Sequence, residues 1–502
     1  MRGIDNLLNS FTTYRVVLCG LIFLACISIF FSGIGIVPFS TINLVVSLLL
    51  ILASCFISNF IYAKIFKVQV NIESFAITGL ILFLILTPYE LGNSPLNYIL
   101  FSTIAMGSKY VLAIHKKHIF NPAAFSLVVM GLFGAYEGEW WIGNTFLFPF
   151  VLLVGLLIVR KVRKFSLFIS YFIFAVISIS IFAYLNGSDV LKILSQAIPS
   201  WPLLFLGTIM LTEPLTMPPK RRLQVFYGAL VGFLTGVQFN IGPFFMTSET
   251  ALILGNIFSY FVSFRKRLIL EFKEKIELSP NIYEFIFKKP SSLSFLPGQY
   301  FEWTLGNRRP DSRGVRRYFT ISSSPTENDI RLGVRLEKDK GSSFKKSLLN
   351  LAPGQKIYAG NLSGDFTLPK NKNEKIVFIA GGIGITPFRS MISFMLDKNE
   401  NRDIVLFYSN AKPEDFVYRD IFYSARQNGL KTVYILTKET TENWNGYTGR
   451  LTAEIIKKEV SDFTNRTYYL SGPIAMVDNY KKLLRRLGIK QNKIITDYFP
   501  GF

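Results

Sequence analysis

Long apolar runs fill the chain up to about residue 264, and short runs that alternate apolar with polar residues begin at residue 268. The long runs predict membrane-spanning helices, because a helix needs about 20 apolar residues to cross a bilayer. Ten segments are predicted, at 14–37, 41–63, 72–87, 95–114, 119–134, 145–160, 165–185, 201–212, 223–239 and 248–264. Several are short or interrupted by Gly or Pro, which favours broken or tilted helices around a site.

Clusters of Lys and Arg lie at alternate ends of these segments. They are Lys64 and Lys67; Lys116 and Lys117; Arg160, Lys161, Arg163 and Lys164; Lys220, Arg221 and Arg222; and Arg265, Lys266 and Arg267. The other connections are uncharged or acidic, with Lys192 as the one basic exception. Since basic residues of short loops stay on the cytoplasmic side, we predict a multi-pass protein of the cell (inner) membrane. Everything after residue 267 is then cytosolic.

The two halves of the apolar region share a spacing of breaks. A shift of 126 positions places Pro88 on Pro214 and Pro122 on Ser248. Each half then holds five segments, an odd number, so the halves are expected to be inverted repeats. In the alternative interpretation, these Pro residues only begin or end helices.

Inverted repeats place their binding site near the helix breaks, at the interface of the two halves. Asn121 precedes one break, and Glu213 and Thr216 flank another. Ionisable groups inside a membrane region are functional candidates by default, which favours Glu213. We therefore predict a membrane site at Asn121, Glu213 and Thr216.

Residues 268–370 read as a small antiparallel β-barrel, with turns at Pro297-Gly298 and Pro353-Gly354. One strand carries Arg317, Tyr318, Phe319 and Thr320. Arginine can clamp a pyrophosphate, an aromatic ring can lie against an isoalloxazine, and a hydroxyl can bond its N5. The run of Gly341, Ser342 and Ser343 can open a helix onto a second phosphate. The alternative is an ordinary strand in a barrel wall.

From residue 375, apolar strands alternate with turns and helices, which is typical of a parallel α/β sheet. The first strand ends in the run that contains Gly381, Gly382, Gly384, Thr386 and Pro387. Glycines at such a turn let the phosphates of a dinucleotide approach the backbone. Two further strand–turn units follow, and the second ends in the run that contains Ser471, Gly472, Pro473 and Met476.

Composition removes several function classes. The net charge of +22 is explained by inner-loop clusters and a pyrophosphate-binding surface, and we find no nucleic-acid motif. The chain has only three cysteines, too few for a Cys-ligated iron–sulfur cluster, and only two histidines, His115 and His118. We therefore expect no haem, no iron–sulfur cluster and no metal site, and interpret both histidines as interfacial loop residues.

Three motifs of the apolar half resemble the RnfD/NqrB family of membrane subunits. They are His118-Ile-Phe-Asn121-Pro122, Leu211-Thr-Glu213-Pro214-Leu-Thr216 and Phe226-Tyr227-Gly228. The resemblance implies a ten-helix flavin carrier, and makes the site at Asn121, Glu213 and Thr216 a membrane electron-transfer site. The family's Ser-Gly-Ala-Thr segment, which carries covalent FMN, has no match, so a second flavin is expected to be non-covalent.

Residues 268–502 resemble the ferredoxin–NADP reductase (FNR) superfamily through the barrel strand, the glycine turn and the last strand, in that order. The resemblance assigns FAD to Arg317, Tyr318, Phe319, Thr320, Gly341, Ser342 and Ser343. It assigns NADH or NADPH to Gly381, Gly382, Gly384, Thr386, Pro387, Gly472, Pro473 and Met476. It also places Thr320, Ser471 and Phe499, of the aromatic tail, at the reacting rings; Ser471 stands where many members have Cys.

The predicted fold is a polytopic α-helical membrane domain (residues 1–267), an FAD-binding β-barrel (268–370) and an NAD(P)-binding α/β domain (371–502). The predicted function is a membrane-bound, FAD-dependent NAD(P)H oxidoreductase that passes electrons to a non-covalent flavin or a quinone, in or across the lipid bilayer. The alternatives are a redox-driven ion or small-molecule transporter, and an anchored reductase for soluble partners. The choice between NADH and NADPH stays open.

Overall fold

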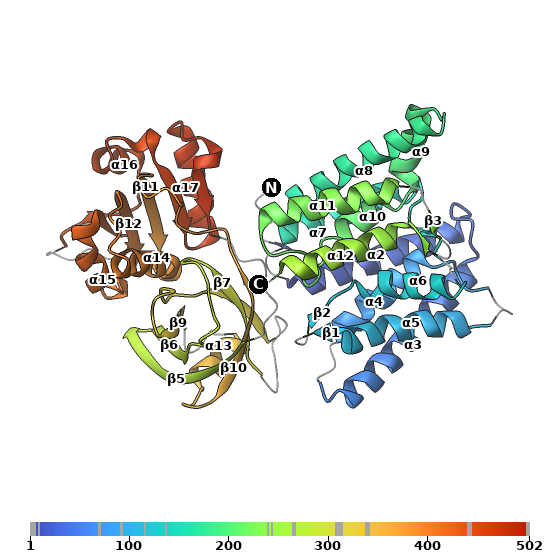
Figure 1. Cartoon of the computed structure of the whole chain (residues 1–502), viewed down its shortest axis with the longest axis horizontal. Helices are drawn as coiled ribbons and strands as arrows, with labels where there is room; N and C mark the ends of the chain where they lie inside the picture. The colour runs from blue at the N-terminus through green and yellow to red at the C-terminus, as the bar shows by residue number, and fades with distance from the viewer. Residues whose placement is uncertain are drawn as a thin grey trace. The chain divides into compact units, whose positions relative to one another are not determined.

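The computed structural model describes residues 7–8, 11–68, 72–90, 94–114, 117–135, 138–237, 240–241, 244–263, 268–306, 315–336, 342–438 and 444–497. The chain divides between residues 265 and 266 into two compact units. In Figure 1 the first unit is helical and blue to green, and the second is mixed and yellow to red.

The first unit is built from apolar helices. They are α2 (Thr13–Gly33), α3 (Thr41–Ile65), α4 (Ile72–Ile85), α5 (Leu96–Val111), α6 (Pro122–Leu132), α7 (Phe148–Val162), α8 (Phe165–Leu185), α9 (Val190–Ser200), α10 (Leu203–Phe205) with the π-turn η1 (Leu206–Met210), α11 (Arg221–Gly236) and α12 (Ser248–Val262). Two short hairpins join them: β1 (Ala113–Ile114) with β2 (Lys117–His118), and β3 (Asn240–Ile241) with β4 (Phe244–Phe245). Each predicted segment overlaps a helix, and α9 is an addition that the apolar pattern did not predict.

Length and hydropathy indicate membrane association of this unit. Among the described residues, α2, α3 and α8 are each long and apolar enough to cross a bilayer. The pair formed by α9 and α10–η1, bent by 58°, could make a fourth span. Large apolar side chains such as Phe30, Phe60 and Ile173 are exposed along these helices, as expected where the solvent is lipid.

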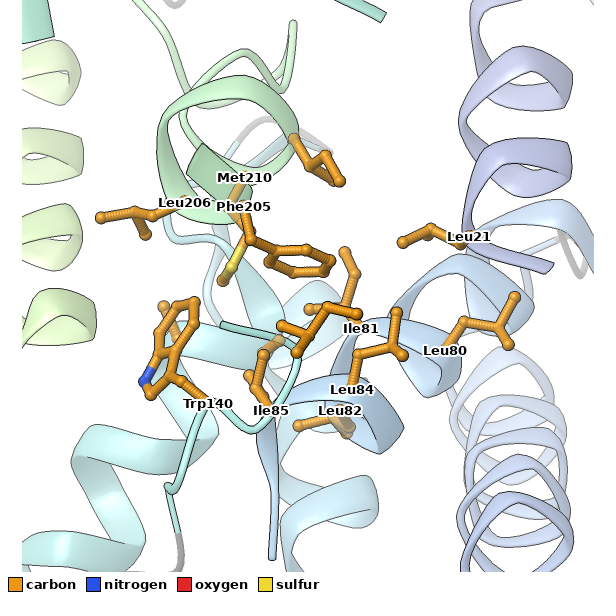
Figure 2. Close-up of a cluster of buried hydrophobic side chains, with 14 of the residues drawn as sticks. Leu21, Leu80, Ile81, Leu82, Leu84, Ile85, Trp140, Phe205, Leu206 and Met210 are labelled. Atoms are coloured by element: carbon orange, nitrogen blue, oxygen red, sulfur yellow. The ribbon is translucent and has the colours of Figure 1, made fainter. Parts of the chain in front are cut away.

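Helix α4 forms the centre of the first unit. Six consecutive residues from Leu80 to Ile85 are at most 6 % exposed, so this helix is covered on all sides. Figure 2 shows Ile81 beside the Phe205 ring of α10–η1, whereas Leu80 points away from it. The end of α4 is closed by the segment after α6, where the backbone N–H of Trp140 donates to Ile85 O at 2.9 Å. The Trp141 indole N–H donates to Phe83 O, also at 2.9 Å.

The second unit begins with a six-stranded antiparallel sheet in the order β8-β7-β10-β5-β6-β9. Its strands are β5 (Leu268–Ser279), β6 (Ile282–Lys288), β7 (Tyr300–Thr304), β8 (Arg316–Thr320), β9 (Asp329–Arg335) and β10 (Lys356–Ser363), with α13 (Ser343–Leu349) between the last two. The two edge strands of this sheet are β8 and β9. They meet directly after β8, where Ser322 N donates to Arg331 O of β9 at 2.9 Å. The sheet therefore curls towards closure, which removes free edges.

A parallel sheet in the order β14-β13-β12-β11-β15-β16 completes the second unit. Its elements are β11 (Ile376–Gly381), η2 (Gly382–Ile385), α14 (Thr386–Asp397), β12 (Ile404–Asn410), η3 (Pro413–Asp415), α15 (Arg419–Ser424), η4 (Ala425–Asn428), β13 (Leu430–Leu436), β14 (Tyr447–Thr448), α16 (Ala453–Glu459), η5 (Phe463–Asn465), β15 (Thr467–Ser471), α17 (Ile474–Arg486), η6 (Gln491–Lys493) and β16 (Ile494–Thr496). The predicted order of an antiparallel sheet followed by a parallel α/β sheet is confirmed.

Helices cover both faces of the parallel sheet, so its central strand β11 is apolar throughout. Ile376 and Phe378 pack under α14 and α15, whereas Val377 and Ile379 pack under α16 and α17. Each such buried side chain contributes about 1.5–3 kcal/mol relative to an exposed one. The strand ends at the glycine turn, so this packing fixes where the turn lies.

Candidate active site

Strand β8 presents Arg317 and Phe319 on one face, as the alternation predicted. The Arg317 side chain is 4 % exposed, and its Cζ lies 5.5 Å from the centroid of the Phe344 ring. The Phe319 ring lies 5.8 Å from the same ring. Arg317 NH1 donates to Arg316 O at 2.6 Å, and a buried guanidinium beside an aromatic ring can also bind the anionic oxygens of a pyrophosphate.

Helix α13 brings the next predicted residues to this face. Ser342 is its N-cap, and the Ser342 hydroxyl accepts a hydrogen bond from Lys345 N at 3.3 Å. Ser343 is the first residue of the helix, and Phe344, which meets Arg317, is the second. Arg317 thus lies close to the start of α13. Gly341 lies outside the described residues.

The other face of β8 carries Tyr318 and Thr320. The Tyr318 ring stands perpendicular to the Tyr300 ring at 5.7 Å, and Thr320 pairs with Tyr300 in the neighbouring strand. Burial raises the pKa of Tyr300 to about 12, and nearby Asp497 adds to the shift, so this phenol remains a donor. Sequence analysis did not single out Tyr300, because one Tyr in an ordinary strand carries no local motif.

Ser471, at the end of β15, reaches the last described part of the chain. Its hydroxyl donates to Asp497 Oδ2 at 3.2 Å, and Asp497 N donates to Leu470 O at 2.9 Å. The residue predicted at the nicotinamide end is therefore bonded to the segment that leads into the aromatic tail. Phe499 lies outside the described residues.

The glycines of the turn after β11 have different roles. Gly382 has φ +56°, and a Cβ built on it would meet only Asn410 Oδ1, at 3.8 Å. A Cβ on Gly384 would lie 2.6 Å from Gly472 Cα, and one on Gly381 would lie 2.3 Å from Met476 Sδ. No side chain fits at Gly381 or Gly384, because neighbouring segments of the chain lie too close to them. Gly382 instead faces open space that a phosphate could use.

The start of α14 meets the barrel at the same place. The Thr386 hydroxyl donates to Ile383 O at 3.2 Å, and Pro387 is the next residue. A Cβ built on Gly333 of β9 would lie 2.8 Å from Thr386 Cγ2. The structure thus brings the two predicted glycine segments together and packs the barrel against them.

A partly buried polar cluster lies in the helical unit, around Glu213, whose side chain is 23 % exposed. The Glu213 carboxylate accepts from Asn121 Nδ2 at 3.0 Å and from the Thr216 hydroxyl at 3.4 Å. His118 Nε2 lies 2.9 Å from Glu213 Oε1. The three residues predicted for the membrane site therefore converge. The interpretation of His118 as a loop residue missed this contact, since nothing local marks a partner 95 positions away.

A second row of polar groups supports the Glu213 cluster. The Asn121 side chain caps α6 by accepting from Ala124 N at 3.2 Å, and Asn121 N donates to Asn256 Oδ1 at 2.8 Å. Asn256 Nδ2 in turn donates to the Tyr227 hydroxyl at 2.9 Å. Helices α6, α11 and α12 are therefore linked through one polar chain. Within the described residues, no group of three or more His, Cys, Asp or Glu side chains could hold a metal ion.

Comparison with known proteins identifies the second unit. The family model of the oxidoreductase NAD-binding domain matches residues 378–482. The glycine betaine monooxygenase reductase subunit of Pseudomonas aeruginosa is 28 % identical over 219 residues, which cover 43 % of this chain and 59 % of that protein. NADH-cytochrome b5 reductase 1 of Ajellomyces capsulatus is 27 % identical over 274 residues, covering 51 % of this chain and 86 % of the relative. The second unit is an FNR-like, NAD(P)H-dependent flavin reductase domain.

These relatives match the chain over only part of their own length. The chain spans 59 % of the length of the Pseudomonas reductase subunit. The Amycolatopsis cytochrome P450 reductase GcoB, a solved structure, is 22 % identical to this chain. The match covers 47 % of this chain and 71 % of the GcoB chain. Its TM-score is 0.41. FAD and NAD(P)H are the cofactors of a domain of this type, and the faces around Arg317 and Gly382 fit them.

Proposed function

We propose that this chain is a membrane-bound, FAD-dependent NAD(P)H oxidoreductase. It passes electrons from cytosolic NAD(P)H through FAD to a flavin or quinone in, or across, the membrane. The observation that carries the proposal is the Glu213 cluster, in which a partly buried carboxylate contacts Asn121, Thr216 and His118. It lies inside an apolar helical unit that is continuous in sequence with a flavin reductase domain. A helical unit that serves only as a membrane anchor does not need a carboxylate with three polar contacts in an apolar region.

Arg317, Ser342, Ser343 and, as the motif predicts, Gly341 hold the FAD pyrophosphate. The buried guanidinium supplies positive charge, and the start of α13 supplies backbone N–H groups. Tyr318 and Thr320, on the opposite face of β8, orient the isoalloxazine, with the Thr320 hydroxyl directed at N5. Bound FAD supplies the conversion of a two-electron hydride into single electrons.

The NAD(P)H phosphates approach the backbone at Gly382, where the structure leaves space. Thr386 and Pro387 begin the helix behind them, while Gly472, Pro473 and Met476 border the nicotinamide end. Ser471, held by Asp497, faces the reacting rings together with the aromatic tail that contains Phe499. These residues bind and orient the donor, and hydride transfer then depends on how the two rings are aligned.

The helical unit is proposed to be a pair of inverted repeats with about ten spans, similar to RnfD/NqrB subunits. Asn121 caps α6 and Thr247 caps α12, 126 positions apart, as the repeat requires. The β1–β2 hairpin precedes α6, and the β3–β4 hairpin precedes α12. In Figure 1, β1 and β2 lie at one end of the helices and β3 lies at the other, which supports opposite orientations.

The Glu213 cluster is proposed as the membrane electron-transfer site. Asn121 and Thr216 donate to the carboxylate and His118 Nε2 lies 2.9 Å from it, so its charge is held inside the apolar unit at reduced cost. The pair of His118 and Glu213 is proposed to pass protons to the acceptor as electrons arrive. A quinone or flavin needs such protons on reduction, because its oxygens or nitrogens become basic.

The test uses the full chain in liposomes that contain a lipid-soluble quinone. Anaerobic NADH or NADPH should bleach the flavin, and the quinone should then reoxidise it in the absence of any soluble acceptor. Reoxidation only by soluble acceptors would contradict the proposal and favour an anchored reductase. An ion flux that stops without NAD(P)H would instead favour the transporter alternative.

A further inference from the structure

Helix α14 contacts both cofactor faces of the reductase domain. Its first residues, Thr386 and Pro387, belong to the dinucleotide cradle. Arg389 and Ser390 follow Pro387 by two and three positions. Arg389 NH1 donates to Ser322 O at 2.9 Å, and the Ser390 hydroxyl donates to Ser323 O at 2.6 Å. Ser322 and Ser323 follow Thr320, the residue directed at the flavin N5, by two and three positions. One helix therefore contacts the donor's cradle and the end of the flavin strand.

The contact is held by an ion pair between the two halves of the domain. Arg389 is 6 % exposed and forms a two-point ion pair with Glu327, with Arg389 NH2 3.2 Å from Glu327 Oε2. Glu327 Oε1 also accepts from Ser324 N at 2.7 Å, so the carboxylate is bonded to the segment that it helps to place. A two-point pair between a guanidinium and a carboxylate fixes orientation as well as distance.

The ion pair continues into a chain that returns to the α/β half. Arg331 Nε donates to Glu327 Oε2 at 2.9 Å, and Arg331 NH1 donates to Glu284 Oε2 at 2.6 Å. The Tyr418 hydroxyl then donates to Glu284 Oε1 at 2.9 Å. Burial raises the pKa of Tyr418 well above its ordinary range, with Glu284 adding to the shift, so the phenol remains a donor. This series of contacts crosses twice between the antiparallel-sheet half and the α/β half, and its two arginines balance the charge of its two glutamates.

We propose that Arg389 and Glu327 are positioning residues for hydride transfer. They fix the register of α14 against the end of β8, and through it the alignment of the nicotinamide with the flavin. Neither residue is assigned to either cofactor, so their loss should leave binding intact and slow the transfer. The inference rests on the proposed reduction of FAD by NAD(P)H, and adds which residues set its geometry.

The test measures binding and transfer separately in the full chain. Arg389→Gln and Glu327→Gln should retain FAD and bind NAD⁺ or NADP⁺ like the parent, as followed by perturbation of the flavin spectrum. In anaerobic stopped-flow experiments, the limiting rate of flavin reduction at saturating NAD(P)H should fall about tenfold to a hundredfold, since small misplacements of reacting atoms cost that much. A donor deuterated at the transferred hydrogen should show a larger isotope effect, because hydride transfer then limits the rate.

Two further variants separate positioning from folding. The double variant should be slowed by less than the product of the two single effects, because both substitutions remove the Arg389–Glu327 pair. Arg466→Gln is the matched control: Arg466 is 7 % exposed and pairs with Asp403 and Asp462, each at 2.6 Å, within the α/β half. It should lower Tm and leave the limiting rate unchanged. Glu327→Asp, which keeps the charge, should be slowed less than Glu327→Gln.

The outcomes are distinct. Parent-like limiting rates in Arg389→Gln and Glu327→Gln, or an equal slowing by Arg466→Gln, would overturn the positioning role and leave the proposed function standing. Loss of FAD from the variants would also overturn it, since the pair would then act in flavin binding. A parent protein whose flavin neither NADH nor NADPH bleaches would overturn the proposed function together with this inference.

Discussion

The two units gather their functional residues in different ways. In the reductase domain, the predicted cofactor residues lie at strand ends and helix starts, a few positions from the motif that marks them. In the helical unit, the groups around Glu213 come from segments up to 95 positions apart. A cofactor cradle can therefore be recognised from local sequence, whereas a buried polar cluster between helices is found only through a long-range pattern such as the repeat.

Replacing the buried arginine of β8 should have the largest effect. We expect Arg317→Ala to be purified with little or no FAD, because charge-assisted hydrogen bonds contribute about 1.5–3 kcal/mol each. Flavin released by denaturation, per mole of protein, measures this. The neighbouring Arg316→Ala is the control, since Arg316 is half-exposed and pairs with Glu302 at 3.4 Å. Equal flavin content in both variants would place the phosphate elsewhere.

Adding a methyl group at the open glycine should affect the donor and not the flavin. Gly382→Ala is expected to keep its FAD and to raise the NAD(P)H concentration needed for half-maximal reduction about tenfold, because the Cβ occupies the space left for a phosphate and strains a positive φ. Gly354→Ala is the control, with φ +83° and open space around it but no place in the cradle. A similar change in both variants would mean that backbone strain alone is responsible.

A smaller effect is expected from the weakest contact of the Glu213 cluster. Thr216→Val removes a hydroxyl that lies 3.4 Å from the carboxylate, so flavin reoxidation by the quinone should slow about twofold to fivefold. Reduction by NAD(P)H should not change. Thr78→Val is the control, because Thr78 is also buried and its hydroxyl donates to Ser74 O of its own helix. If the control slows reoxidation equally, the Thr216 contact has no special role.

The sequence allowed much of the reductase domain to be predicted because its signals are local. The alternation of β8 correctly grouped Arg317 with Phe319, and the glycine turn lies at the end of β11. Local signals did not distinguish Gly382, which faces space, from Gly381 and Gly384, which pack against the chain. That distinction depends on how β15 and α17 approach the turn.

The helical unit was less predictable, because apolar patterning says where helices are but not what they enclose. Helix α9 was missed since polar residues such as Lys192 and Gln196 interrupt its apolar run. The repeat led to Asn121, Glu213 and Thr216, whereas His118, which begins one of the motifs that resemble RnfD/NqrB, was interpreted as a loop residue. The bond from Asn256 to Tyr227 was missed because both residues lie within apolar runs, and only packing brings them together.

The central claim is that electrons leave the reductase domain through the Glu213 cluster. Stopped-flow spectroscopy of Glu213→Gln in quinone-containing liposomes tests it most directly, with Glu73→Gln, an acid paired with Arg15 at the surface of the same unit, as the control. The account predicts flavin reduction by NAD(P)H at the parent rate and reoxidation by the quinone at least about tenfold slower, as for loss of a proton-transfer group. Reoxidation at the parent rate in folded Glu213→Gln would contradict it.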